Sequence, residues 1–307
     1  MDVFNVKIIE YANGQVEIRK YSVPIGIDKL NCINETKEQV ARKISFGKRK
    51  SELERQGDLM FNPFNKKVER LQTFEQVEIE KERVKKNLKD SLNRTRQELY
   101  KISRQCKWEY FITLTFSPDL VDRTDYVKCM QKANKWFNNQ RSRYADDLQY
   151  VFVPELHEDK KSWHIHGLIA QVGNMSFVDS GHKSKGKIIY NLGGWKYGFS
   201  TAVEVGNTQD DVFRVSNYIT KYITKDLCEI TKGKRRYFRS QNIPAPIEYI
   251  EWLKPSEVDN YIDKVVGSLG VSLDYEKTVD GFVGVNYRYY KHFEESEDKK
   301  SGRREKV

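Results

Sequence analysis

Three residues in the middle of the chain have the types and the spacing of a metal site. His164 and His166 flank Ile165, so in a strand both imidazoles project from the same face. Glu155 belongs to the preceding apolar run, 150–155. If the two runs pair as a hairpin with Glu155 opposite His164, all three side chains converge. Two imidazoles and a carboxylate are typical ligands of a divalent metal.

The alternative is a solvated strand face that carries histidines by chance. A further histidine, His157, lies in the polar segment 157–162, which we expect to form the hairpin loop. We therefore treat His157 as a loop residue, with ligand substitution as a minor alternative. The ligand set alone does not identify a reaction, because zinc hydrolases and non-haem iron oxygenases both use it.

A second segment, 211–227, adds a pair of tyrosines. Its apolar residues recur at helical spacing, at positions 212, 215, 219, 223 and 227, and Asp210 and Asp211 suit a helix start. On one such helix Tyr218 and Tyr222 would lie one above the other, with Cβ atoms about 5–6 Å apart. The alternative is that both tyrosines pack at the edge of the core.

Together these segments resemble the HUH endonuclease superfamily, and within it the replication initiators of rolling-circle plasmids and small single-stranded DNA phages. The family's three motifs are matched in order by Phe-Ile-Thr-Leu-Thr-Phe at 111–116, by His164-Ile165-His166, and by the pair Tyr218 and Tyr222. Glu155 falls where the family has its carboxylate ligand. The resemblance covers roughly residues 95–245, and the basic segment 233–242 looks like the strand that follows the tyrosine helix.

The resemblance implies an enzyme that nicks and rejoins single-stranded DNA at an origin. A tyrosine oxygen would attack phosphorus, link the protein to the 5′ phosphate and release a 3′ hydroxyl. Because a phenol has a pKa of ~10, it needs help from a cation that polarises the phosphate. We expect Mg²⁺ or Mn²⁺ on Glu155, His164 and His166, with Mn²⁺ favoured by imidazole ligands.

Two tyrosines suggest more than one cut, with one holding the 5′ end while the other attacks the regenerated junction. The alternative is that one is catalytic and the other supports it. A lysine follows each tyrosine by three residues. Lys221 or Lys225 would stabilise a phenolate or hold the phosphate.

The charge of the chain favours a polyanionic partner, since 54 Lys and Arg outnumber 44 Asp and Glu. Residues 81–107 contain ten basic and three acidic residues and are expected to form a helix along DNA phosphates, with Lys85 and Lys86 as contacts. Arg235 and Arg236 are further DNA-binding candidates. The alternative for such lysines is a solvated helix face.

The elements expected along the chain predict the α+β class with a central five-stranded antiparallel sheet flanked by helices, the HUH nickase fold. We expect a hairpin over 3–10 and 15–27, helices over 81–107 and 124–144, and strands over 110–116, 148–156, 163–171, 200–205 and 234–240. The predicted organisation is an N-terminal extension, 1–75, a nicking domain, 76–292, and a disordered charged tail, 293–307.

Other patterns limit the class of protein and its location. The four cysteines are scattered without a C-x-x-C pair, and neither a signal peptide nor an apolar run of membrane length is evident. A bacterial host cytoplasm is the expected location. Segment 181–188 nearly matches a phosphate-binding P-loop but lacks its final Ser or Thr, so we interpret it as a basic hairpin loop.

No ATPase domain is therefore expected, and unwinding would come from a host helicase or from supercoiling, with a host polymerase extending the 3′ end. The expected substrate is single-stranded or supercoiled DNA at a replication origin. Alternatives are a conjugative relaxase or a transposase of the same superfamily, or a non-catalytic nucleic-acid-binding module. An iron oxygenase is disfavoured because it needs neither the basic helix nor the tyrosines.

Overall fold

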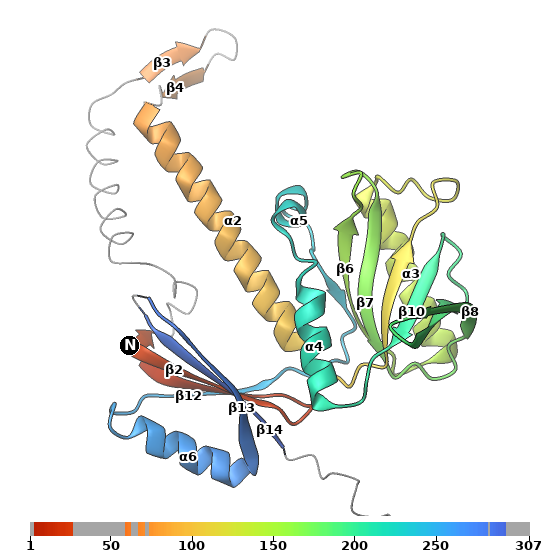
Figure 1. Ribbon diagram of the computed structural model, residues 1–307. Helices are drawn as coiled ribbons and strands as arrows, with labels where there is room; N and C mark the ends of the chain where they lie inside the picture. The colour runs from red at the N-terminus through yellow and green to blue at the C-terminus, as the bar shows by residue number, and fades with distance from the viewer. Residues whose placement is uncertain (1–2, 27–58, 63–66, 71–73, 282, 293–307) are drawn as a thin grey trace, which may run out of the picture. The chain divides into compact units, whose positions relative to one another are not determined.

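The computed structural model describes residues 3–26, 59–62, 67–70, 74–281 and 283–292 (Figure 1). They form two compact units. One combines the described residues up to Gly26 with those from Ile247 onward, and the other comprises those from Leu59 to Pro246. Both units contain antiparallel sheet and helix, so the α+β class predicted from the sequence is correct.

The first unit is a five-stranded antiparallel sheet in the order β12-β1-β2-β14-β13. Its elements are β1 (Val3–Glu10), β2 (Val16–Gly26), β12 (Ile247–Glu251), α6 (Val258–Leu269), β13 (Val271–Val279) and β14 (Val285–His292). Val258 and Ile262 of α6 pack on Val6, Ile8 and Ile18, which alternate along β1 and β2. The predicted N-terminal hairpin is confirmed, with Gly14 at positive φ in its turn.

Strands from the two ends of the chain pair with each other in this unit. β1 pairs with β12, and β2 pairs with β14. The compact units therefore have boundaries different from the predicted segments 1–75 and 76–292, which were divided according to where the family motifs lie and not according to strand pairing. Residues 27–58 of the predicted extension, and the predicted tail 293–307, lie outside the described residues.

The second unit is built on a seven-stranded sheet in the order β11-β6-β7-β5-β10-β9-β8. Its strands are β5 (Tyr110–Thr115), β6 (Gln149–Leu156), β7 (Trp163–Ala170), β8 (Phe177–Ser184), β9 (Lys187–Leu192), β10 (Ser200–Glu204) and β11 (Phe238–Arg239). A separate short pair, β3 (Leu59–Asn62) with β4 (Lys67–Arg70), also belongs to this unit.

The sheet that carries the candidate site thus has seven strands, not the five predicted. The two strands missing from the prediction are β8 and β9, which pair across the turn Lys185-Gly186, where both residues have positive φ. β8 is mostly exposed and polar, so its sequence lacks the apolar alternation that marks a half-buried strand. β9 is half-buried and its apolar residues Ile188, Ile189 and Tyr190 do suit a strand, so its omission from the predicted sheet was an error. The segment 181–188, interpreted as a basic hairpin loop, does contain a hairpin turn, but only Lys185 and Gly186 form it and the flanking residues belong to β8 and β9.

Helices cover both faces of this sheet (Figure 1). On one face lies α3 (Tyr126–Tyr144), where Phe137 stacks on Tyr150 and Phe152 of β6. On the other lies α4 (Gln209–Thr220), where Tyr218 meets Phe111 of β5 edge to face. The basic helix α2 (Phe74–Ser103) packs against α4 and α5 (Lys225–Ile230).

The single helix predicted over the tyrosine segment is wrong, because the segment is two helices. α4 ends at Thr220, and α5 starts at Lys225. The side chain of Thr224 accepts a hydrogen bond from the backbone N–H of Leu227, which starts the second helix. Apolar spacing continues through the break because Ile219, Ile223 and Leu227 are all buried, so periodicity alone conceals it.

Within the described residues, no helix is both long and apolar enough to cross a membrane.

Candidate active site

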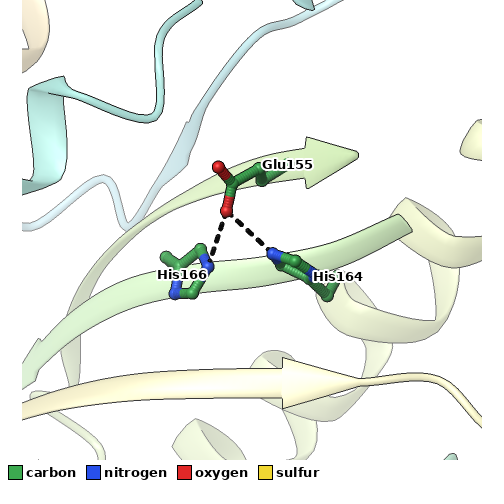
Figure 2. A group of neighbouring side chains, drawn as sticks. All are labelled: Glu155, His164 and His166. Atoms are coloured by element: carbon green, nitrogen blue, oxygen red, sulfur yellow. Dashed lines mark hydrogen bonds and ion pairs between the residues drawn. The ribbon is translucent and has the colours of Figure 1, made fainter. Parts of the chain in front are cut away.

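Glu155, His164 and His166 converge on the α4 face of the sheet (Figure 2). The register between β6 and β7 sets Glu155 opposite His164, as the hairpin argument predicted. One carboxylate oxygen, Oε2 of Glu155, lies 2.8 Å from Nε2 of His164 and 2.9 Å from Nε2 of His166. One donor atom from each of the three residues lies within 4.8 Å of the other two, which is close enough for the group to hold one metal ion.

The donor set fits a divalent metal. Cis ligands of an octahedral ion at 2.0–2.1 Å are separated by about 3 Å, which is close to the separations of the carboxylate oxygen from the two imidazole nitrogens. Three protein ligands also leave coordination positions for water or substrate. Without a metal, the histidines hold the carboxylate ionised. Burial alone would raise the pKa of Glu155, but hydrogen bonds from His164 and His166 lower it to about 2.

His166 is held by more than the carboxylate. The pKa of His166 is lowered, chiefly because burial disfavours the charged imidazolium; His164 adds to this effect and Glu155 opposes it. A neutral imidazole is the form that binds metal. Oγ1 of Thr113 on β5 lies 3.1 Å from Nδ1 of His166, so it can orient the ring through the nitrogen that does not contact Glu155.

Gly167 allows the histidine strand to lie close to its neighbours. A Cβ at this position would stand 3.0 Å from the carbonyl oxygen of Val151 and 3.2 Å from Cγ1 of Ile112. The third histidine of this region, His157, lies in the turn between β6 and β7, where it is exposed, so its predicted place in the loop is confirmed.

The two tyrosines lie beside this cluster in spite of the break in the helix. The ring of Tyr222 stacks on His166, with ring centroids 3.9 Å apart. The hydroxyl of Tyr222 donates to that of Tyr218 over 3.0 Å. Burial, the hydrogen bond to Tyr218 and the negative charge of Glu155 all raise the pKa of Tyr222. Tyr218 is 44 % exposed, so its phenol is open to solvent.

Phe111 lies next to both tyrosines and next to His166. Its ring lies 5.3 Å from that of Tyr218, 6.3 Å from that of Tyr222 and 5.8 Å from that of His166, measured between centroids. Sequence reasoning assigned no role to Phe111 or Thr113. A signal was present, because residues 111, 113 and 115 alternate along a strand and must share one face.

The two lysines that follow the tyrosines differ in position. Nζ of Lys221 lies 5.3 Å from the centre of the Tyr218 ring, a cation–π contact beside the phenol. Lys225 is exposed on α5, with its ammonium 3.9 Å from the carboxylate of Glu229. Of these two cations, Lys221 is therefore the one that contacts a tyrosine.

The residues predicted to contact DNA also separate into two groups. Lys85 is exposed on α2 and Lys86 is half-buried, while Arg235 is exposed in the segment before β11. Arg236 instead points into the protein, where Nη1 donates to Oγ of Ser91 over 2.6 Å and to Oγ1 of Thr95 over 3.1 Å. The guanidinium of Arg236 therefore holds the segment before β11 against α2.

Helix α2 supports the tyrosine segment directly. Nε of Arg96 donates to the carbonyl oxygen of Ile223, the residue after Tyr222, over 2.8 Å. Arg236 adds a contact to the carbonyl oxygen of Cys228 on α5. The C-terminal half of the basic helix therefore fixes the break between α4 and α5, a role that its charge did not indicate.

Comparison with known proteins gives one result for this region. Residues 109–227, which span β5 to α5, match the model of a family described as replication-associated protein, ORF2 type. The matched region includes Glu155, both histidines and both tyrosines, and a replication initiator is consistent with it. Neither the curated proteins nor the solved structures contain a match to the chain.

Proposed function

We propose that this protein is a replication initiator of the HUH type, which nicks and rejoins single-stranded DNA at an origin through a tyrosine. Glu155, His164 and His166 form what we call the metal-type cluster. The observation that carries the proposal is the contact of Tyr222 with this cluster: the Tyr222 ring stacks on His166 while its hydroxyl contacts Tyr218. The family match over 109–227 supports a role in replication.

In the proposed reaction, a phenolic oxygen forms a bond to phosphorus as the bond from phosphorus to the 3′ oxygen breaks. The phenol loses its proton, the leaving oxygen gains one, and the number of phosphodiester bonds is unchanged. The 3′ hydroxyl can prime a polymerase, and reversal of the step by a 3′ hydroxyl rejoins the strand. No external energy source is required, because the tyrosyl ester keeps the bond energy.

The two tyrosines have different surroundings, and we assign the first attack to Tyr218. Tyr218 is the more exposed phenol and has Lys221 beside its ring. Tyr222, with its raised pKa, stays protonated and donates its hydroxyl hydrogen to the oxygen of Tyr218, which stabilises a phenolate there. Tyr222 would attack in a later step, once Tyr218 carries DNA.

Glu155, His164 and His166 are the residues that would hold Mg²⁺ or Mn²⁺. Such a cation, when bound, supplies Lewis-acid stabilisation of the charge that grows on the phosphate oxygens. Thr113 keeps the His166 ring in the orientation that presents Nε2 to the site. The donor set favours Mn²⁺ over Mg²⁺ because it has two imidazoles.

The proposal is tested with single-stranded oligonucleotides tiled across the replicon and labelled at either end. We expect a covalent protein–DNA product in Mn²⁺, none in EDTA, and transfer only of the label that lies 3′ of the nick. His164→Ala should lower the yield at least ~100-fold, because it removes a ligand of the cation. His182→Ala, on the exposed strand β8, should not change it.

Tight binding without a covalent product at any position would favour a nucleic-acid-binding module instead. A product formed only on DNA from a transfer origin would favour a relaxase, and one formed only on the ends of a mobile element a transposase.

We further propose that a host helicase and polymerase act with the protein on origin DNA, because the released 3′ end must be extended as the strands separate.

A further inference from the structure

Phe199 has the largest exposed fraction of any aromatic side chain in the described part of the chain, 61 %. It follows Gly198 and immediately precedes β10. Single exposed apolar residues are common on protein surfaces, so the exposure alone indicates nothing. The place of Phe199 in the sheet is informative, because Phe199 lies in the same row across the strands as two of the candidate metal ligands, Glu155 and His164.

The register of four strands defines that row. Glu155 on β6 is opposite His164 on β7, and His164 is opposite Thr115 on β5. The backbone N–H of Thr115 then donates to the carbonyl oxygen of Phe199 over 2.8 Å, which continues the pairing of β5 with β10 by one residue. Since neighbouring strands are about 4.8 Å apart, the backbones of His164 and Phe199 are about 10 Å apart.

The side chain of Phe199 lies on the same face as the histidines. Leu114 is fully buried and lies opposite Ser200, which is also buried, so this pair faces the core beneath α3. Thr113 contacts His166, so it faces the site, and it lies opposite Thr201. Alternation along the two strands places Phe199 with Thr201 on the site face.

The segment that carries Phe199 is firmly anchored. A Cβ on Gly198 would stand 2.2 Å from the carbonyl oxygen of Thr115, so only glycine permits this close approach. Nε1 of Trp195 donates to the same oxygen over 3.2 Å, and the Trp195 ring packs against Phe116 and Trp136. The backbone that carries Phe199 is therefore fixed, which reduces the entropy lost on binding.

We propose that Phe199 is a stacking platform for one unpaired base of the DNA strand near the scissile phosphate. The inference rests on the proposed function, and it assigns a subsite to that substrate. A flat apolar ring beside a phosphate-binding centre suits the face of a nucleobase. The residue between His164 and Phe199 in this row is Thr115, whose hydroxyl can donate to a phosphate and whose neutral side chain does not repel it.

The separation of His164 and Phe199 is within the reach of a nucleotide or two of an extended strand. A phosphate at the metal-type cluster would therefore place a nearby base over Phe199. Because every base has a π-face, the platform would fix the position of the strand without selecting its sequence. The expected effect is on strand placement, and through it on the choice of the bond that is cut.

The test is an abasic scan of binding by the full-length protein. Its affinity for a fluorescent single-stranded oligonucleotide from the replicon is measured in Mn²⁺, by anisotropy, with one base removed at a time. Every protein in the scan, including the one with wild-type Phe199, carries Tyr218→Phe and Tyr222→Phe so that no strand is cut. At the stacked position the wild type should lose about 5- to 150-fold in affinity. Phe199→Ala should bind the intact strand as weakly as the wild type binds that abasic strand, and should show no further loss there.

Two variants separate stacking from folding and from simple apolar contact. Phe199→Trp should restore the position-specific loss, and its fluorescence should be quenched by DNA, whereas Phe199→Leu should not restore the loss. Tyr144→Ala removes another exposed aromatic, which lies at the end of α3 beneath the opposite face, and should leave the scan unchanged.

An abasic profile of Phe199→Ala identical to that of the wild type would overturn the proposal, and so would full affinity in Phe199→Leu. The scan needs no cleavage, so the two proposals can fail separately. A covalent product with an unchanged profile would reject the stacking platform alone. A position-specific effect of Phe199 without any covalent product would reject the nickase alone.

Discussion

At the scale of single residues, the orientation of His166 depends on groups on several sides. Glu155 contacts its Nε2, Thr113 contacts its Nδ1 and Tyr222 covers its ring. When Nε2 binds a cation, Nδ1 must carry the hydrogen, and Oγ1 of Thr113 is the acceptor within reach. The metal affinity of the cluster should therefore depend on a residue that is not a ligand.

We predict that Thr113→Val lowers the affinity for Mn²⁺ about 10- to 100-fold, because it removes that acceptor while keeping the side-chain shape. Isothermal titration calorimetry or the electron paramagnetic resonance of free Mn²⁺ measures the change. Thr201→Val, on the strand opposite Thr113, is the matched control and should bind as the wild type does. Equal affinity in the two variants would show that Thr113 does not orient the ligand.

The tyrosines give a second prediction at this scale. Tyr218→Phe should abolish the first covalent attachment, because the attacking oxygen is gone. Tyr222→Phe should retain attachment at a reduced rate, about 10-fold slower if its hydrogen bond to the Tyr218 phenolate contributes ~1.4 kcal/mol. Single-turnover rates on a denaturing gel distinguish the two. A reversed order, with Tyr222 essential and Tyr218 dispensable, would contradict the assigned roles.

At the scale of elements, the basic helix α2 has two different parts. Around Lys85 it is solvent-exposed, whereas further along Leu99 is fully buried and Arg96 holds the carbonyl oxygen of Ile223. The helix thus supports the segment that carries the tyrosines. The adjacent residues Arg235 and Arg236 differ in a similar way. Arg235 is exposed to solvent, and Arg236 is hydrogen-bonded to α2.

We predict that Arg236→Met lowers the free energy of unfolding of the second unit by about 1–3 kcal/mol, because it leaves the Ser91 hydroxyl and the Cys228 carbonyl without this donor. Arg235→Met should leave stability unchanged and weaken DNA binding, reducing the slope of log affinity against log salt by about 1. Urea denaturation and salt titrations provide the measurements. The same loss of stability in both variants would contradict the distinction.

The parts of the site that sequence could predict are those fixed by local pairing. Glu155 and His164 are opposed across a short turn, which Asp159 stabilises by accepting from the N–H groups of Lys161 and Ser162, so their register follows from nearby residues. Thr113 and Phe199 reach the site only through pairing of distant strands, which spacing does not reveal. The break between α4 and α5, in which Tyr222 lies, involves a threonine cap that the continuous apolar periodicity conceals.

At the scale of the whole molecule, the two units differ in how the chain builds them. Strands from both ends of the chain form the first unit, and the residues between those ends form the second. The first unit needs both ends, since β12 pairs with β1 and β14 with β2, and Val16 and Ile18 pack on α6. The described residues of the second unit all lie between Leu59 and Pro246, and they contain the whole candidate site.

This arrangement predicts that removing one end of the chain is more harmful than removing both. Deletion of residues 247–307 leaves β1 and β2 as an unpaired hairpin with exposed apolar side chains, which should aggregate. A fragment of residues 57–246 should remain soluble, unfold cooperatively and bind Mn²⁺. Size-exclusion chromatography, thermal unfolding by circular dichroism and calorimetry test this. The prediction would be contradicted if the protein lacking residues 247–307 were soluble and the 57–246 fragment were insoluble.

The central claim is that a tyrosine of this cluster becomes joined to DNA, and peptide mapping of the covalent product tests it most directly. The protein is incubated with its cleaved oligonucleotide and Mn²⁺, digested with nuclease and protease, and analysed by tandem mass spectrometry. We predict a phosphotyrosyl nucleotide on Tyr218, and no adduct in the Tyr218→Phe variant. An adduct on any other residue, or one that persists in the Tyr218→Phe/Tyr222→Phe double variant, would contradict the account.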